Sequence, residues 1–429
     1  MKNLTLENIE NHFKDKKTKF GISLDALDYL KRVGFPDTKN EDWKYTDVKD
    51  ILTTLYEWNP QTILDKRDFN EIQLKADERA YYAVLVNGNF IDSLSKLPNL
   101  DEFLKIKPIS KVNLNEIPYF EKYIGKIANY KLDSFTALNT IFIHDGLFIY
   151  LGKNQILEKP LYIYCIDDGR YQNSFSQVRN TLVFEKNAKA CIVEVYASLG
   201  EQITFSNHVT EIYMDVSTCI EYVKIQNLNN NGNAVTKTHV YQKKHSASAL
   251  LTFSLGGNVV RNNLQVILDD ENCETHMHGL VIANGYSHID NHTVVEHQKP
   301  YSTSNELYKN ILGDHATGVF NGKILVAQDA QKTLAYQSNQ NILLSNNSSI
   351  NSKPQLEIFA NDVKCSHGAT SGQLNEQALF YLRSRGIDEK TAKIILTQAF
   401  AEDIVEKVKV PELREELKVV ILNKLNDMI

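Results

Sequence analysis

The chain has few cysteines for its length, and their spacing argues against two common uses of this residue. Its 429 residues include five, at positions 165, 191, 219, 273 and 365, and no two of them form a Cys-x-x-Cys pair. An odd count without that spacing fits neither a disulfide framework nor a zinc finger. We therefore expect the protein to work in a reducing compartment, the cytoplasm.

The sequence also has no excess of basic residues and no long apolar run. Lysine and arginine number 47 against 53 aspartates and glutamates, which gives a net charge of −6. Without a basic stripe, the chain has no electrostatic footprint for a nucleic acid. No apolar run approaches the length of a membrane span, and Met1–Glu7 has no apolar core of signal-peptide length. We expect neither a nucleic-acid partner nor a membrane.

Signatures of nucleotide and serine-hydrolase chemistry are missing as well. The segment nearest to a phosphate-binding loop, Gly318–Ile324, is one residue short between its glycines. It also has Ile324 where the loop needs a hydroxyl for magnesium. No Gly-x-Gly-x-x-Gly follows a strand-like segment, and no Gly-x-Ser-x-Gly occurs. The sequence therefore predicts no nucleotide site in this chain.

Helical signals dominate the first part of the chain, and we expect residues 1–134 to form a mostly helical domain. Ser23 is placed to cap a helix, and Gly34 is placed to end it. The same domain contains one strong strand signal, Tyr81–Val86, which is followed by the turn dipeptide Asn87-Gly88. The apolar stripe of the helix is predicted to consist of Leu24, Leu27 and Leu30.

Short strand-like segments fill residues 135–371, with turns rich in asparagine and glycine between them. This pattern is typical of a sandwich, a barrel or a solenoid, and the residues alone leave these three open. The separations between Cys165, Cys191 and Cys219 are similar, which favours stacked coils. Examples of the segments are Leu147–Leu151, Thr181–Phe184, Cys191–Tyr196 and Cys219–Ile225.

The tail, residues 372–429, is predicted to be a helical domain. Asn375 and Asp388 are placed as helix caps, and Pro411 is placed in a first helical turn. The apolar side of the last helix either docks on the β body of the same chain or binds a partner, and both readings stay open. That side consists of Leu413, Leu417, Val420, Ile421 and Leu425.

Cys365 and His367 lie where the strand pattern gives way to helix. In an extended segment, residues two apart share a face, so a thiol and an imidazole point the same way. Such a pair suits a thiophilic metal. The alternative is that Cys365 is a small buried hydrophobe and His367 a hydrogen-bonded structural residue.

The second half contains the motifs Gly318–Ile324, Gln328–Thr333, Ala335–Asn339, Lys353–Ile358 and Cys365–Ile387. These motifs resemble the SufB/SufD family of iron-sulfur cluster assembly scaffold proteins. Within the family, the Cys-Ser-His-Gly-Ala-Thr stretch and the chain length are similar to SufD rather than to SufB. The N-terminal segment Phe35–Thr46 resembles the family too, although we interpret its Trp43 as a packing residue.

The resemblance implies a mainly β fold, in which a right-handed parallel β-helix core over residues 135–371 lies between the two helical domains. It also implies a scaffold without catalytic activity that joins a SufB-like paralogue and a SufC-like ATPase in the SUF complex. A transient iron-sulfur cluster would be built in that complex. His367, and secondarily Cys365, would contribute to the nascent cluster or to its interface, shared with the partner.

Other readings stay open beside this one. The chain could be a SufB-like or self-pairing scaffold, a homodimer when isolated, and the complex could hold a flavin. From another class, a β-helix carbohydrate-active enzyme could use Asp269-Asp270-Glu271 and Asp290 as paired carboxylates, although the first three read equally well as a solvated turn. The histidines between 276 and 315 lack the spacing of a tetrahedral site, so none is assigned as a ligand.

Overall fold

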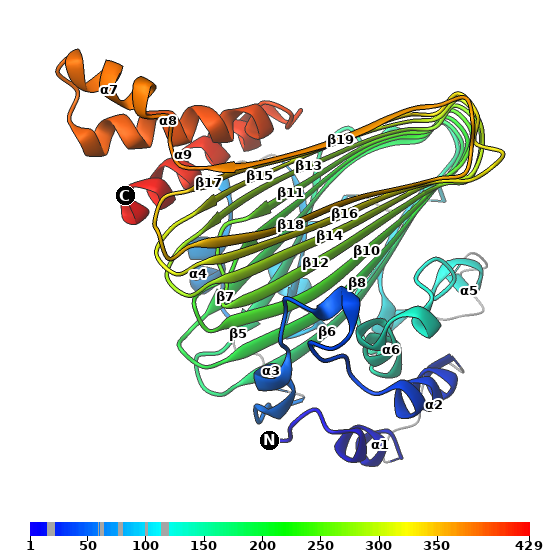
Figure 1. Cartoon of the computed structure of the whole chain (residues 1–429). Coiled ribbons are helices and arrows are strands. Elements are labelled where there is room, and N and C mark those ends of the chain that lie inside the picture. The colour runs from blue at the N-terminus through cyan, green and yellow to red at the C-terminus, as the bar shows by residue number, and fades with distance from the viewer. Residues whose placement is uncertain (15–21, 59, 61–63, 76–79, 99–101, 113–119) are drawn as a thin grey trace.

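The computed structural model describes residues 1–14, 22–58, 60, 64–75, 80–98, 102–112 and 120–429. In this part of the chain, two long sheets face each other along a flattened parallel β-solenoid (Figure 1). From β5 onward, consecutive strands alternate between the sheets, so odd strands form one sheet and even strands the other. The protein is therefore mainly β, with helices before and after the solenoid, as predicted.

Each coil of the solenoid contributes one strand to each sheet. In order along the odd sheet, the described strands are β2 (Asn89–Phe90), β1 (Tyr81–Val86), β5 (Leu161–Asp168), β7 (Lys189–Leu199), β9 (Cys219–Asn227), β11 (Ala247–Ser254), β13 (Glu274–Ala283), β15 (Thr303–Leu312), β17 (Leu334–Leu343) and β19 (Lys364–Gly372). Along the even sheet they are β3 (Leu104–Pro108), β4 (Leu147–Leu151), β6 (Ser174–Phe184), β8 (Thr204–Met214), β10 (Gly232–Gln242), β12 (Val259–Leu268), β14 (His288–His297), β16 (Thr317–Val326) and β18 (Ser349–Ile358).

In-register parallel pairing fixes which side chains face the interior. Met277 pairs with Glu306, Glu306 pairs with Gln337, and Gln337 pairs with His367. Since side chains alternate between faces along a strand, all members of such a ladder lie on the same face of the sheet. Met277 belongs to the apolar cluster between the sheets, so this ladder faces inward.

The repeat of the coils is visible in the backbone rather than in residue types. A non-glycine residue with positive φ lies two positions before each of the strands β7 to β17 of the odd sheet. This left-handed conformation turns the chain into the next coil, and asparagine adopts it more readily than most residues. The cysteines, by contrast, do not stack, because Cys165 faces the interior and Cys191 packs on the outer face. The turn residues are Asn187, Ser217, His245, Asn272, Tyr301 and Lys332.

Two groups of helices cover the solenoid. The first comprises α1 (Leu6–Lys14), α2 (Ile22–Val33), α3 (Lys49–Thr53), α4 (Lys66–Ile72), α5 (Phe120–Tyr123) and α6 (Ser134–Ile141). The second comprises α7 (Glu376–Ser384), α8 (Glu389–Val405) and α9 (Pro411–Met428). Asn375 and Asp388 cap α7 and α8 through their side chains, and Pro411 opens α9, as predicted. No helix in the described ranges is long and apolar enough to cross a membrane.

The early helix prediction is confirmed in its position but not in its cap. Gly34, with a φ of +70°, follows the last residue of α2, and Leu27 and Leu30 are buried. Leu24 is exposed, and Ser23 lies inside the helix, where its hydroxyl donates to the carbonyl of Thr140. The strand Tyr81–Val86 also forms, but it pairs with β5 and so belongs to the odd sheet of the solenoid.

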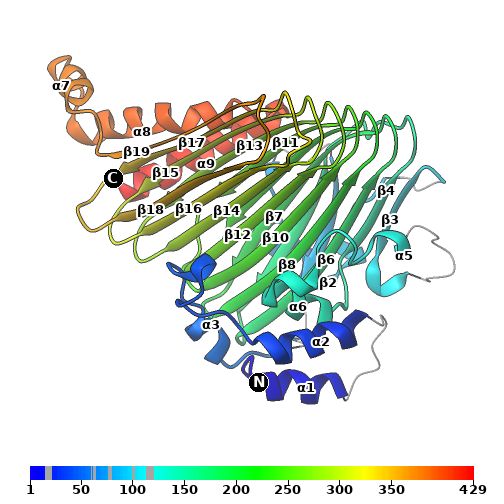
Figure 2. The same ribbon diagram turned by 45° about the vertical axis from the view of Figure 1, so that its right-hand side comes forward.

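Helices α8 and α9 dock on the outer face of the odd sheet. Leu413, Leu417, Ile421 and Leu425 are fully buried in a cluster with valines and leucines of that sheet. The apolar side of the last helix is therefore used within the chain. By contrast, α7 buries none of its residues and projects away from the sheets in both views (Figures 1 and 2).

The segment after α2 is held on the even sheet by a buried arginine. The Arg261 guanidinium lies 3.8 Å from the centre of the Trp43 ring, donates to the backbone carbonyl of Asp42 and pairs with Asp290 at 2.8 Å. The hydroxyl of Thr46 donates to the same carboxylate. Trp43 is thus a packing residue that doubles as a cation–π partner.

A second buried ion pair holds the segment before α6. Arg179 Nε donates to Glu211 Oε2 at 2.9 Å, and both side chains are fully buried. The Glu211 carboxylate also accepts hydrogen bonds from the backbone amides of Gly125, Ile127 and Ala128. One carboxylate therefore connects strand β8, its neighbour β6 and the N-terminal region.

We expect Glu211→Ala to destabilise the protein severely. The change would leave the Arg179 guanidinium buried without its counter-charge and three backbone amides without an acceptor. Breaking a buried pair in this way costs about 3 to 5 kcal/mol. Chemical denaturation followed by circular dichroism measures the loss, with the exposed Glu201→Ala as a control of equal charge change. A loss no larger than that of the control would contradict the role assigned to Glu211.

Candidate functional site at the open end of the solenoid

The last coil leaves both sheets with an unpaired edge. Among the described residues, β19 pairs with β17 and β18 pairs with β16, and neither has a partner on its other side. At the opposite end, the two sheets finish in the antiparallel strands β2 and β3. Unpaired edges present rows of free N–H and C=O groups that readily pair with another chain. The solenoid is therefore open at its C-terminal end.

His367 lies on β19 at the mouth of this open end. It continues the inward ladder of Glu306 and Gln337, but no further coil covers it, so its side chain is exposed. An inward-facing imidazole at an open mouth is accessible to a ligand or to a partner chain.

Cys365 shares the inward face with His367 but has a different environment. It pairs in register with Ala335 and packs against an apolar cluster that includes Ile324 and Val326. Burial raises the pKa of its thiol, although a backbone hydrogen bond at Ala335 opposes the shift. Cys365 is half-buried, so part of its surface faces the opening. The structure thus places the two predicted site residues on one face, with His367 the more accessible.

A buried carboxyl group lies behind His367, and the sequence analysis missed it. Glu306 accepts hydrogen bonds from Thr293 and from Gln337 Nε2, and burial raises its pKa to about 7. The strand alternation in Thr303–Leu312 contained the signal, since Glu306 shares a face with Tyr308. The interior near the opening is therefore polar, with a carboxyl group that titrates near neutral pH.

Glu306 should make the stability of the protein depend on pH. Its pKa is about 7 in the folded chain against an ordinary value of 4.5. Between these values the folded state holds a proton that the unfolded state has released, so stability falls as pH rises through this window. Between pH 4.5 and about pH 7, the wild type should lose about 3 kcal/mol of unfolding free energy relative to the Glu306→Gln variant. Denaturation of both proteins at a series of pH values measures this, and a constant difference would contradict it.

The Cys365 and His367 pair does not make a complete metal site. Within the described residues, no three or more histidine, cysteine, aspartate or glutamate side chains are grouped so as to hold a metal ion. Iron-sulfur clusters are held by thiolate and, less often, imidazole ligands, usually four in number. Two ligands at an open edge suit a site that a second chain completes.

Comparison with known proteins identifies the family. Residues 166–400 match the domain described as "SUF system FeS cluster assembly, SufBD core domain". Residues 21–163 match the "SufBD protein N-terminal region". The chain belongs to the SufBD family. The core match extends from the first coils of the solenoid into α8, and so includes the open end with His367.

Relatives within the SufBD family are similar over nearly their whole length. The iron-sulfur cluster assembly SufBD family protein of Synechocystis is 29% identical over 92% of this chain and 88% of its own. The iron-sulfur cluster assembly protein SufD of Escherichia coli is 28% identical over 91% of this chain and 89% of its own. The chloroplast protein ABCI7 of Arabidopsis thaliana is 28% identical over 90% of this chain and 81% of its own. The chain is a SufD-like member of the SufBD family.

The carboxylates proposed for a carbohydrate-active enzyme have structural partners instead. Burial alone would raise the pKa of Asp290, but Arg261 and His292 hold it well below its usual range. Asp269 pairs with Lys243 at 2.7 Å and also accepts from Tyr241. Asp290 and Asp269 are thus engaged in ion pairs and hydrogen bonds within the solenoid, which favours the SufBD scaffold interpretation over this alternative.

The remaining histidines of this SufBD protein are divided between faces. His297 faces the interior and contacts the hydroxyl of Ser304, whereas His292 contacts Asp290 at 3.0 Å on the even sheet. His276 and His278 line a cavity on the outer face of the odd sheet. The segment that partly resembles a phosphate loop is the extended strand β16, which does not have the conformation of such a loop.

Proposed function

We propose that the chain is a non-catalytic, SufD-like scaffold subunit of a SUF complex, and that its open solenoid end pairs with a SufB-like paralogue. The unpaired edge of β18 and β19, with His367 and Cys365 beside it, is the observation that carries this proposal. Strand pairing across the edge would continue both sheets into the partner. The same edge could pair with a second copy of the chain, which gives the self-pairing alternative.

A nascent iron-sulfur cluster would be the cargo of this interface rather than a resident cofactor. His367 would supply an imidazole from the mouth, and Cys365 a second ligand if its thiol loses its proton. Thiolate and imidazole are suitable ligands for iron. The remaining ligands would come from the partner, which accounts for the incomplete set in the described part of this chain.

Helix α7 is the surface that we assign to a SufC-like ATPase. Phe380 is 75% exposed and Tyr381 is 58% exposed on this helix, which has no buried residue. Neighbouring aromatic side chains at such exposure are enriched at protein interfaces. Arg385, whose guanidinium lies 5.3 Å from the centre of the Tyr381 ring, adds positive charge nearby, whereas Arg383 pairs with Glu389 at 3.5 Å. Hydrolysis of ATP would then occur in the partner, in agreement with the lack of a phosphate loop in this sequence.

The ligand role of His367 is tested by comparing His367→Ala with His367→Cys. A thiolate also binds iron, whereas it cannot replace an imidazole that both donates and accepts hydrogen bonds. We expect the alanine variant to abolish cluster formation in the co-expressed complex and the cysteine variant to restore part of it. The anaerobic visible spectrum of the purified complex measures the cluster, and would also reveal a bound flavin.

Stability and composition of the complex provide the control for His367. Because the side chain is exposed, both variants should unfold at the wild-type temperature and retain their partners. Normal cluster formation in His367→Ala would contradict the ligand role. Failure that coincides with loss of the partner would instead assign His367 to the interface alone.

The role of α7 is tested with the double variant Phe380→Ala/Tyr381→Ala. Removing two interface aromatics typically costs several kcal/mol of binding, on the order of a hundredfold or more in affinity. We expect loss of the co-purifying ATPase without a change in thermal stability, because neither ring is buried. Tyr286→Ala, at a ring that is 80% exposed on a solenoid turn, is the matched control. An ATPase that still binds the double variant would refute the assignment.

A further inference from the structure

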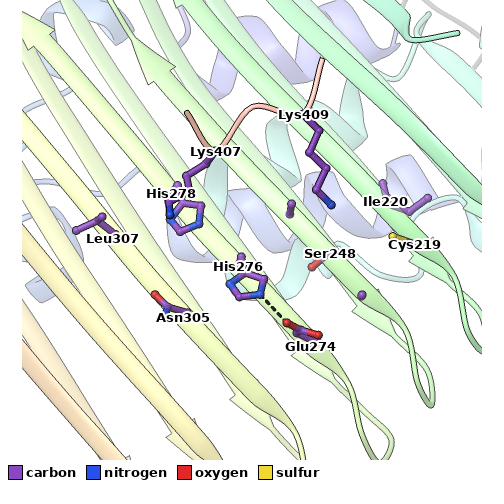
Figure 3. A pocket seen from close by; sticks show the side chains of 12 residues that line it. Cys219, Ile220, Ser248, Glu274, His276, His278, Asn305, Leu307, Lys407 and Lys409 are labelled. Atoms are coloured by element: carbon purple, nitrogen blue, oxygen red, sulfur yellow. Dashed lines mark hydrogen bonds and ion pairs between the residues drawn. The ribbon is translucent and has the colours of Figure 1, made fainter. Parts of the chain in front are cut away.

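A cavity of about 600 Å³ lies on the outer face of the odd sheet, over β9 to β15 (Figure 3). Small side chains on β11, Ala247 and Ala249, form part of its floor, between larger residues of β9 and β13. The segment that joins α8 to α9 crosses above it and contributes Lys407 and Lys409 to its lining. This size suits a small organic molecule.

The joining segment is fixed to the sheet, so its lysines are held at the cavity. Val408 is fully buried between them, and the backbone amide of Lys409 donates to Glu221 Oε1 at 2.7 Å. Both lysine side chains remain exposed, and in the described part of the chain neither has a carboxylate within ion-pair distance. The cavity therefore has two cationic groups on an anchored segment, of which Lys409 also interacts electrostatically with Glu221.

A buried imidazole faces the same cavity. His278 is 7% exposed, and its Nδ1 has no hydrogen-bond partner in the described ranges. Burial, together with the nearby His276 and Lys407, lowers its pKa to about 4. The ring is therefore neutral at physiological pH, and no contact at Nδ1 fixes its tautomer, so either nitrogen can donate.

The remaining polar groups of the cavity have partners or lie at its rim. His276 Nε2 contacts Glu274 Oε1 at 2.6 Å, so the one carboxylate in the lining is already occupied (Figure 3). Two lysines disfavour a metal cation through repulsion, and they favour an anion. Apolar lining from Ala249 and Leu307 provides contact for the body of a ligand.

We propose that this cavity binds a phosphoryl group, held by Lys407, Lys409 and His278. Lysine ammonium groups and a neutral imidazole N–H are donors that bind phosphate oxygens through charge-assisted hydrogen bonds. The ligand is either inorganic phosphate or a small phosphate ester whose body lies on the apolar lining. It would join the α8–α9 segment to the sheet and so stabilise the docked helices. The proposal is independent of cluster assembly.

The test is calorimetric titration of the full chain with inorganic phosphate and with AMP at constant ionic strength. We expect binding that weakens about tenfold in Lys407→Gln/Lys409→Gln and in His278→Gln, as loss of charge-assisted hydrogen bonds predicts. Tighter binding of AMP than of phosphate would assign the site to an ester, and equal binding would assign it to free phosphate. Thermal unfolding of each variant without ligand confirms that it is folded.

The control is Lys153→Gln/Lys364→Gln, which removes the same charge from two exposed lysines elsewhere on the solenoid. It should bind both probes as the wild type does. If phosphate binding weakened equally in this control, the loss would come from the change in net charge, and the proposed site would be wrong. Absence of binding by either probe at millimolar concentration, or binding that the lysine variant leaves unchanged, would overturn it as well.

Discussion

Backbone pairing between successive coils is the constraint on which the rest of this structure depends. Each coil satisfies its N–H and C=O groups through the coil before and the coil after, and the ladders keep their register along both sheets. Such an array has no natural end, so each terminus needs a cap. The N-terminal end has the antiparallel strands β2 and β3, whereas the last coil has none in the described chain. An added strand at this end would continue the same pairing.

The same pairing allows charged groups inside the solenoid. Glu194 accepts hydrogen bonds from Asn180 and Thr210 of the facing sheet, and Lys224 donates to Thr236 across the same interior. Burial lowers the pKa of Lys224 to about 8, against the attraction of Glu194. Two facing sheets in fixed register place donors opposite acceptors, which compensates the cost of removing these groups from water.

Local signals in the sequence predicted the elements well, but not their register. Caps such as Asn375 and the strand Tyr81–Val86 depend on neighbouring residues, and both formed. The inward face of Glu306 follows from the alternation of its own strand, but its position opposite Gln337 depends on pairing with a strand about thirty residues away, which no local pattern specifies. The repeat was also hidden, since the turn before each of the strands β7 to β17 of the odd sheet needs a left-handed residue, and asparagine, serine, histidine, tyrosine and lysine all fill it. His367 was found through its resemblance to a family, whereas its place at an open mouth required the fold.

Pairing through a strand edge also explains how the last coil can hold reactive side chains. In the proposed complex, main-chain hydrogen bonds of β18 and β19 would supply the contact with the partner, and these bonds are available whatever the side chains are. The side chains of the edge strands are then not needed to hold the partner. His367 can remain exposed, and Cys365 half-buried, without weakening the solenoid behind them. An interface built on side-chain packing would instead have to bury both groups, and a nascent cluster would have no open position in which to form.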